Sequence, residues 1–205
     1  MFSDPSPFAP IEGTQQAPRG LFVKRWGTLL VEPENGFPTE PDELEFVEGA
    51  IDCLYRAGRA GWNVYLVGNE EPVWKGDVDK AIWDRLQERI HAKLEAAGVP
   101  LVRDYACIDH PEGIPGRTND SVYLLPNTGA FYQAAHFDGI DLQNSWLVGD
   151  ETVELVAAWR AGVRTAGVRS GKGLGDGTFA VDPEIEGATL TEVVSTLLRL
   201  AAEMS

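Results

Sequence analysis

Charged and polar residues stand at or just after the ends of several short apolar segments of the sequence. They are Lys24, Asn69, Asp150 and Arg169. Ammonium and guanidinium groups bind anions, whereas a carboxylate can bind a cation or transfer a proton. The apolar segments have the length and composition of buried strands. We therefore expect the residues that follow them to share one pocket.

The rest of the sequence predicts the elements that position these residues. Strand-like segments cover residues 21–23, 63–67, 101–107, 145–148, 164–168 and 179–181. Apolar residues at helical spacing predict helices over 41–60, 77–97, 128–136, 152–161 and 191–202. Strands that alternate with helices form a mainly parallel sheet covered on both faces, with the ligand pocket beyond the carboxyl ends of the strands. The predicted fold class is α/β.

The composition is strongly acidic. The chain has 32 Asp and Glu residues against 17 Lys and Arg, which gives a net charge of −15. An anionic surface opposes binding to nucleic acids and to anionic membranes, so we expect neither as a partner. The sequence has no apolar run long enough for a transmembrane helix and no secretory signal pattern. We expect a cytoplasmic protein.

Local composition predicts the bounds of the domain and the state of its cysteines. Residues 1–20 are rich in proline and small polar residues, which predicts a flexible N-terminal arm before one domain over 21–205. Cys53 falls within a helical pattern and is expected to be buried. Two cysteines do not favour a disulfide framework.

Several short motifs, in the same order along the chain, resemble those of the haloacid dehalogenase (HAD) superfamily. The closest likeness is to its compact branch of heptose-bisphosphate and histidinol-phosphate phosphatases. The motifs are Gly27-Thr28, residues 45–51, Gly68-Asn69-Glu70, residues 146–150, Ala161-Gly162-Val163 and residues 168–172. The resemblance covers about residues 20–200. It implies a HAD-like Rossmannoid fold, a doubly wound parallel sheet without a large cap domain.

The resemblance also shows which residues depart from the family pattern. In that family one Asp attacks phosphorus and binds Mg²⁺, and a second Asp acts as general acid and base. These two positions hold Lys24 and Trp26 here, and Leu125 stands where the family has a lysine. An ammonium repels Mg²⁺, and an indole cannot transfer protons usefully. We therefore expect no catalytic residue at these degenerate positions.

These departures favour a catalytically inactive phosphatase homologue over an enzyme. Such a protein would bind a phosphorylated small molecule, or act as a scaffold or subunit in a homo- or hetero-oligomer. The alternative is an active hydrolase, a phosphatase for a small phosphorylated metabolite, that uses a displaced carboxylate such as Asp150. No cofactor is expected, and Mg²⁺ would bind only under the alternative, with Asp150 as its ligand.

The candidate pocket residues leave several alternatives open. Lys24 could take the place of Mg²⁺ and pair with Asp150, Glu154 or Glu70, or it could point to solvent. Trp26 could plug the pocket or stack on a ligand. Arg169 and Lys172 could hold an anion or be solvated, and Asn69 could be a ligand contact or a turn residue. The candidate set is Lys24, Trp26, Thr28, Asn69, Asp150, Glu154, Arg169 and Lys172.

The resemblance further raises the question of a structural zinc site, because that branch often carries a loop with two Cys/His pairs. Cys107 and His110 keep a fragment of the first pair, and residues 117–123 contain neither Cys nor His. A structural zinc ion takes four ligands. We therefore expect no zinc.

Overall fold

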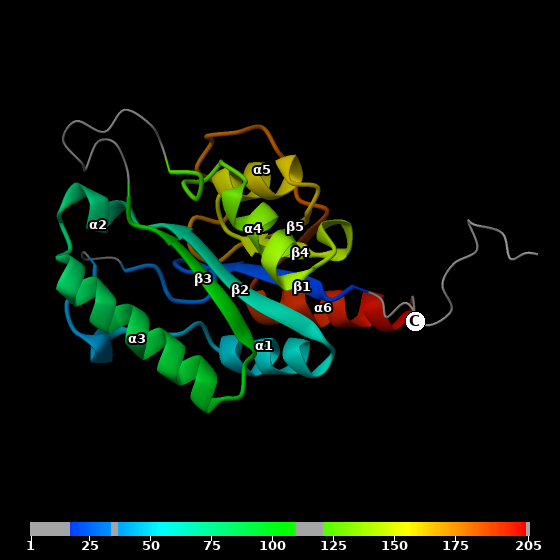
Figure 1. The fold of residues 1–205 in the computed structure, drawn as a ribbon, viewed down its shortest axis with the longest axis horizontal. Coiled ribbons are helices and arrows are strands. Elements are labelled where there is room, and N and C mark those ends of the chain that lie inside the picture. The colour runs from blue at the N-terminus through cyan, green and yellow to red at the C-terminus, as the bar shows by residue number, and fades with distance from the viewer. Residues whose placement is uncertain (1–16, 34–36, 110–120, 204–205) are drawn as a thin grey trace, which may run out of the picture.

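The protein is described by a computed structural model that covers residues 17–33, 37–109 and 121–203. Its centre is a parallel sheet with the strand order β3-β2-β1-β4-β5-β6 (Figure 1). The strands are β1 (Arg19–Lys24), β2 (Trp62–Asn69), β3 (Leu101–Cys107), β4 (Trp146–Gly149), β5 (Arg164–Val168) and β6 (Ile185–Gly187). The α/β fold class and the parallel sheet are confirmed.

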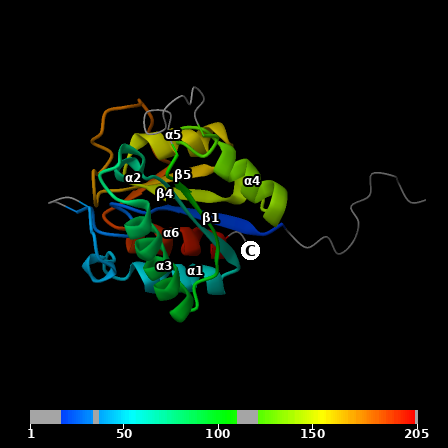
Figure 2. The ribbon, with the colours of Figure 1, turned by 60° about the vertical axis from the view of Figure 1, so that its left-hand side comes forward.

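Helices cover both faces of this sheet. Helices α1 (Ala50–Arg59), α3 (Lys80–Ala96) and α6 (Leu190–Glu203) lie on one face. Helices α4 (Gly129–Asp138) and α5 (Thr152–Arg160) lie on the other, as Figure 2 shows from the side. The short helix α2 (Glu71–Lys75) follows the end of β2. No large cap domain is present among the described residues.

Each face of the sheet has its own apolar core. One core joins the sheet to α1, α3 and α6, and the other joins it to α4 and α5. In β1, Leu21 and Val23 point into the first core and Phe22 into the second. A strand that is buried on both faces must be apolar along its whole length. This is why the central strands read as continuous apolar segments in the sequence.

The order of the strands brings the predicted pocket residues together. β1 lies between β2 and β4, with Val23 level with Val148 and Lys24 level with Val67. Lys24 therefore ends its strand beside the turn that carries Asp150. These residues meet because parallel strands place their carboxyl ends at the same edge of a sheet.

Some predicted boundaries were wrong. The segment expected as one helix over 41–60 contains a short 3₁₀ turn at Pro41–Glu43 and the helix α1, which begins only at Ala50. Residues 179–181 are not a strand, and the sixth strand is β6 further along. The first strand begins at Arg19, within the expected arm. Residues 1–16 of that arm lie outside the described residues.

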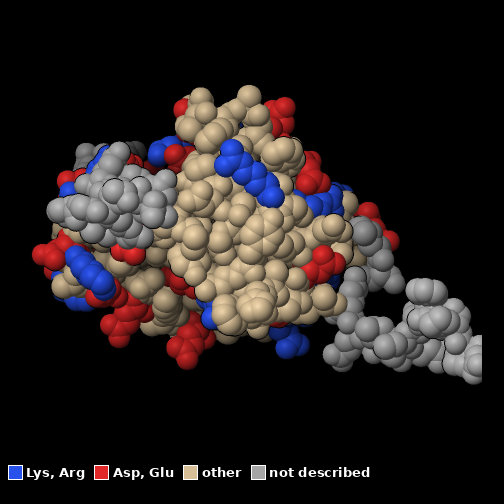
Figure 3. All heavy atoms as spheres, turned by 45° about the horizontal axis from the view of Figure 1, so that its top comes forward, with Lys and Arg blue, Asp and Glu red and all other residues tan. Residues whose placement is uncertain are grey.

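The charge on the surface is unevenly spread. Figure 3 shows a broad face on the side of α4 and α5 with few charged side chains. Three large apolar side chains of these helices, Tyr132, Phe137 and Trp159, are exposed. Within the described residues, no helix has the length and apolar character needed to span a bilayer.

Candidate functional site

A cavity of about 350 Å³ lies at the carboxyl ends of the central strands. It combines two ammonium groups, several carboxylates and an aromatic wall. Its lining residues are Lys24, Trp26, Glu32, Phe37, Asn69, Glu71, Pro72, Trp74, Leu124, Leu125, Glu151, Val153, Glu154 and Lys172. Such a mixture of charged and apolar groups in a concave site suits a small polar ligand.

Lys24 is held by carboxylates rather than by solvent. Its Nζ lies 2.9 Å from Asp150 Oδ1 and 3.8 Å from Glu154 Oε1, and it also pairs with Glu151. Burial alone would lower the pKa of Lys24, but the carboxylates of Glu154, Asp150 and Glu151 raise it above its ordinary value. Lys24 is therefore a fixed ammonium ion. Its predicted pairing with Asp150 and Glu154 is confirmed, whereas Glu70 pairs elsewhere.

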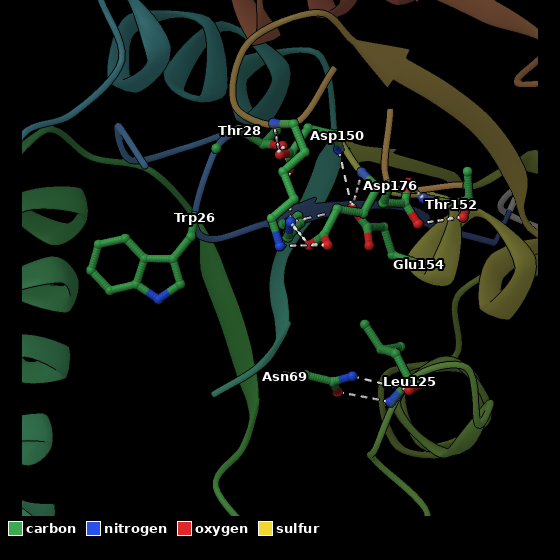
Figure 4. A network of polar contacts seen from close by, with 12 residues as sticks. Trp26, Thr28, Asn69, Leu125, Asp150, Thr152, Glu154 and Asp176 are labelled. Atoms are coloured by element: carbon green, nitrogen blue, oxygen red, sulfur yellow. Dashed lines mark hydrogen bonds and ion pairs between the residues drawn. The ribbon is translucent and has the colours of Figure 1, made fainter. Parts of the chain in front are cut away.

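Asp150 is fully buried and its carboxylate is shared by several donors. Thr28 Oγ1 donates to Asp150 Oδ1 at 3.0 Å, and the backbone N–H of Lys172 donates to Oδ2 at 2.8 Å. Gly27 and Gly171 lie directly against this carboxylate, where a Cβ atom on either residue would come within 2.2 Å of Oδ2. Figure 4 shows Asp150 next to Thr28, with Glu154 close by. Asp150 thus ties the turn after β1 to the loop after β5.

Glu151 bridges two ammonium groups at the wall of the cavity. One carboxylate oxygen pairs with Lys24, and the other accepts a hydrogen bond from Lys172 Nζ at 2.8 Å. Burial alone would raise the pKa of Glu151, but Lys24 and Lys172 hold it below its ordinary value. The side chain is 18% exposed, in contrast to the fully buried side chain of Asp150. Glu151 is therefore an ionised carboxylate that a ligand can reach.

Two further carboxyl groups of the cavity have raised pKa values. Burial raises the pKa of Glu154 to about 8, although Lys24 opposes the rise. Burial likewise raises the pKa of Glu32, which lines the cavity. The Oε2 atoms of Glu32 and Glu154 are buried and have no hydrogen-bond partner among the described residues. Carboxyl groups of this kind hold protons at a higher pH than exposed ones.

Trp26 forms a wall of the cavity and does not fill it. Its ring packs edge-on against Phe37 at a centroid distance of 4.9 Å, and Nε1 donates to Glu70 Oε2 at 3.0 Å. Figure 4 shows the indole directed away from the cluster around Asp150. Only 6% of the residue is exposed. Trp26 therefore does not plug the pocket, and its stacking on a ligand stays a prediction.

Behind this wall lies a buried ion-pair network that the sequence did not predict. Arg25 is fully buried and pairs with Glu70 and Asp104. Asp104 Oδ2 also lies 2.8 Å from His91 Nε2, and Gln87 donates to it at 3.1 Å. Burial alone would raise the pKa of Asp104, but Arg25 and these neighbours hold it below its ordinary value. The only signal in the sequence was a second cation directly after Lys24.

Some of the remaining candidate residues line the cavity, and others do not. Asn69 lines the cavity, but its side-chain amide pairs with the backbone N–H and C=O of Leu125, as Figure 4 shows. Arg169 does not line the cavity, because its guanidinium pairs with Glu186 and donates to the Gly173 carbonyl. Arg169 was therefore a wrong choice as a pocket residue. Thr28 contributes only indirectly, through Asp150.

Of the two residues that keep a fragment of the zinc loop, the structure describes only Cys107. The Cys107 thiol is buried and donates to the Asp109 carbonyl oxygen at 3.3 Å. His110, the other half of the fragment, lies outside the described residues. Among the residues that the structure describes, no three or more Asp, Glu, His or Cys side chains are arranged to hold a metal ion.

Comparison with known proteins identifies similar sequences over most of the chain. A D-glycero-beta-D-manno-heptose-1,7-bisphosphate 7-phosphatase of Escherichia coli O6:H1 is 30% identical over 170 residues, which covers 82% of this chain and 85% of the relative. The protein of the same name from Haemophilus ducreyi is 32% identical over 158 residues, with 76% and 86% covered. No model of a protein family matches the chain.

Solved structures show the same fold. The D,D-heptose 1.7-bisphosphate phosphatase from B. bronchiseptica, complexed with magnesium and phosphate, has a TM-score of 0.75 at 24% identity and covers 89% of this chain and 99% of its own. A putative HAD-like phosphatase from Mesorhizobium loti has a TM-score of 0.72 at 23% identity, with 93% and 89% covered. At this level of identity the likeness concerns the fold.

Proposed function

This chain belongs to the heptose-bisphosphate phosphatase branch of the HAD superfamily, and on that premise we propose that it hydrolyses a phosphate monoester in the cavity beside Lys24. The substrate is a small phosphorylated metabolite. The relatives' names make D-glycero-beta-D-manno-heptose 1,7-bisphosphate the first compound to assay. The observation that carries the proposal is the reachable Glu151 carboxylate, held between the ammonium groups of Lys24 and Lys172.

The relatives correct two expectations from the sequence. We expected a catalytically inactive homologue that binds a ligand or acts as a scaffold, and we favoured a protein without enzyme activity. Proteins named as phosphatases match more than three quarters of this chain, which supports the active alternative instead. The residues at positions 24 and 26 still differ from the family pattern. The reaction therefore needs another reacting carboxylate.

The Mg²⁺ ion that the family uses does not fit the residues of this site. The carboxylates of Asp150, Glu151 and Glu154 all face the Lys24 ammonium, which already supplies the positive charge among them. A divalent cation bound by these carboxylates would lie next to the fixed Lys24 ammonium, and the two positive charges would repel each other. The proposed reaction therefore uses only groups of the chain and water.

Glu151 is the displaced carboxylate that the geometry favours. Asp150, the residue suggested by the sequence, is fully buried and occupied by Thr28, Lys24 and the backbone of Lys172. Glu151 lines the cavity and stays ionised, because two ammonium groups lower its pKa. Lys24 and Lys172 would also bind the phosphoryl oxygens and balance their charge. Asp150 then acts as a positioning residue for Lys24.

The proposed reaction proceeds in two balanced steps. A Glu151 oxygen bonds to phosphorus while the ester P–O bond breaks, and the leaving oxygen takes a proton from the Glu32 carboxyl group. Water then attacks the phosphorus of the resulting acyl phosphate and gives one proton to Glu32. The P–O bond to Glu151 breaks, which regenerates the Glu151 carboxylate and releases inorganic phosphate. Glu32 suits this role because it lines the cavity and burial raises its pKa.

The proposal is tested by release of inorganic phosphate from the heptose bisphosphate and from a generic aryl phosphate. We expect Glu151→Gln to lower kcat by about 100-fold or more, because an amide is not a nucleophile. Glu71→Gln is the matched control, since Glu71 lines the same cavity but pairs with Lys75. Equal rates in the wild type and Glu151→Gln would remove Glu151 from the mechanism.

A further inference from the structure

The positive charge at the centre of the site comes from the chain itself. Lys24 Nζ lies where one oxygen from each of Asp150, Glu151 and Glu154 is directed. The oxygens of Asp150 and Glu151 lie within hydrogen-bond distance of the ammonium, and the Glu154 oxygen lies 3.8 Å from it. The stem of Lys24 is fixed because it ends the buried strand β1 and only 9% of the side chain is exposed. The ammonium therefore has a defined position rather than a mobile one.

A second observation shows that the carboxylates are arranged around a cation. Glu154 is fully buried, lines the cavity and leaves its Oε2 atom without a hydrogen-bond partner among the described residues. Its other oxygen, Oε1, accepts from the backbone N–H groups of Asp150 and Glu151 at 3.1 and 2.8 Å. Lys24 Nζ lies 3.8 Å from Oε1, and its positive charge opposes the rise in the pKa of Glu154 that burial causes.

We infer that the Lys24 ammonium is a built-in substitute for a divalent cation, so that the site takes up such a cation only when this ammonium is removed. The carboxylates of Asp150 and Glu151 lie close together at Lys24 and repel each other, so they need a positive charge beside them. Without Lys24 they would recruit one from solution. Hard divalent ions such as Mg²⁺ bind carboxylate oxygens in preference to other protein ligands.

This inference does not depend on the proposed hydrolysis, because it concerns the stability of the site and needs no substrate. The test uses the full chain, with Mg²⁺ alone as the probe, and reads thermal melting and titration calorimetry. We expect the wild type to show neither a binding heat nor a change in Tm at about 10 mM Mg²⁺. We expect Lys24→Ala to melt lower without Mg²⁺ and to gain about 5 °C or more when Mg²⁺ is added.

Two further variants distinguish Mg²⁺ binding after loss of Lys24 from a general change in stability caused by mutation. Lys24→Met removes the charge but keeps a long side chain among the carboxylates, so its Tm should fall without recovery in Mg²⁺. Lys172→Ala removes the other ammonium partner of Glu151 while Lys24 remains, so Mg²⁺ should leave its Tm unchanged. Wild-type stabilisation by Mg²⁺ equal to that of Lys24→Ala overturns the inference. A Lys24→Ala chain that gains nothing, or that stays unfolded with Mg²⁺ present, overturns it as well.

Discussion

At the scale of single residues, the neighbouring cations Lys24 and Arg25 organise two separate networks. Side chains alternate across a strand, so the two residues face opposite ways at the end of β1. Lys24 faces Asp150, Glu151 and the cavity. Arg25 faces Glu70 and the ring of Trp83, with Cζ 5.0 Å from its centroid. One network lines the cavity, and the other supports the aromatic wall through the bond from Trp26 to Glu70.

The pairing of Lys24 with Asp150 could be predicted from the sequence, whereas the Arg25 network could not. The pairing follows from two strand ends that must meet at one edge of a parallel sheet. The Arg25 network joins the turn after β1 to β3 and α3, and its members Asp104 and His91 carry no local signal. Asp104 stands within a strand pattern, where a polar residue is usually solvated. Only the packing of α3 shows that it is buried.

The depressed pKa of Asp104 predicts how acid acts on this network. The folded pKa lies below the ordinary value of 3.8, so the stabilising effect of the carboxylate is complete above that value. It is lost as the pH falls through the folded pKa. Asp104→Asn should therefore reduce the free energy of unfolding at neutral pH, and the gap to the wild type should narrow below about pH 4.

Urea unfolding across this pH range measures the gap, which is the difference in the free energy of unfolding between the variant and the wild type. Asp84→Asn serves as the control, because Asp84 is an exposed residue of the same region whose partner is Lys80. Its gap to the wild type should be small at every pH. A gap for Asp104→Asn that stays constant from neutral to acid pH would mean that the carboxylate is not held ionised by Arg25.

At the scale of elements, the turn after β1 and the loop after β5 close around Asp150. Gly27 and Gly171 adopt φ angles of 78° and 59°, in the left-handed region. Ser170 Oγ donates to the Gly27 carbonyl at 2.7 Å, so the two segments are also linked directly. The Gly-Thr turn and the Gly-Lys loop were visible in the sequence. Their mutual contact was not, because 143 residues separate the two partners.

Replacement of Gly171 tests this close approach. An alanine Cβ there would lie 2.2 Å from Asp150 Oδ2 and 2.5 Å from Gly27 Cα. Gly171→Ala should therefore destabilise the protein by more than the ~1–2 kcal/mol of a left-handed alanine alone. Gly162→Ala is the matched control, since Gly162 has φ 77° but no atom within 4 Å of the added Cβ. Equal unfolding free energies for the two variants would show that the loops are not in contact.

The boundaries of other elements show where a sequence pattern fails. The apolar residues of 41–60 have helical spacing, yet Val31 N donates to Glu45 O and Val47 N donates to Leu29 O. These bonds to the segment after β1 keep residues 45–47 extended. Tertiary pairing thus overrode the local preference for helix. The helix begins only after Gly49, which has a φ angle of 71° that a helix cannot contain.

At the scale of the whole molecule, the chain keeps the fold of its family and changes the charges at its centre. The sheet and its two helical layers agree with the resemblance to the HAD superfamily and with the fold of solved structures. Lys24 places an ammonium ion among the carboxylates at this centre. The sequence predicted its pairing with Asp150. It did not identify Glu151 as the reachable carboxylate, since its exposure depends on how α5 begins.

Phosphate release by the purified wild-type chain is the most direct test of the proposed hydrolysis. The substrates are D-glycero-beta-D-manno-heptose 1,7-bisphosphate and a generic aryl phosphate, each with EDTA and with Mg²⁺. We expect inorganic phosphate to be released from at least one of them, at the same rate in EDTA as in Mg²⁺, because Lys24 supplies the central positive charge. Absence of release under both conditions, or release that requires Mg²⁺, would contradict it.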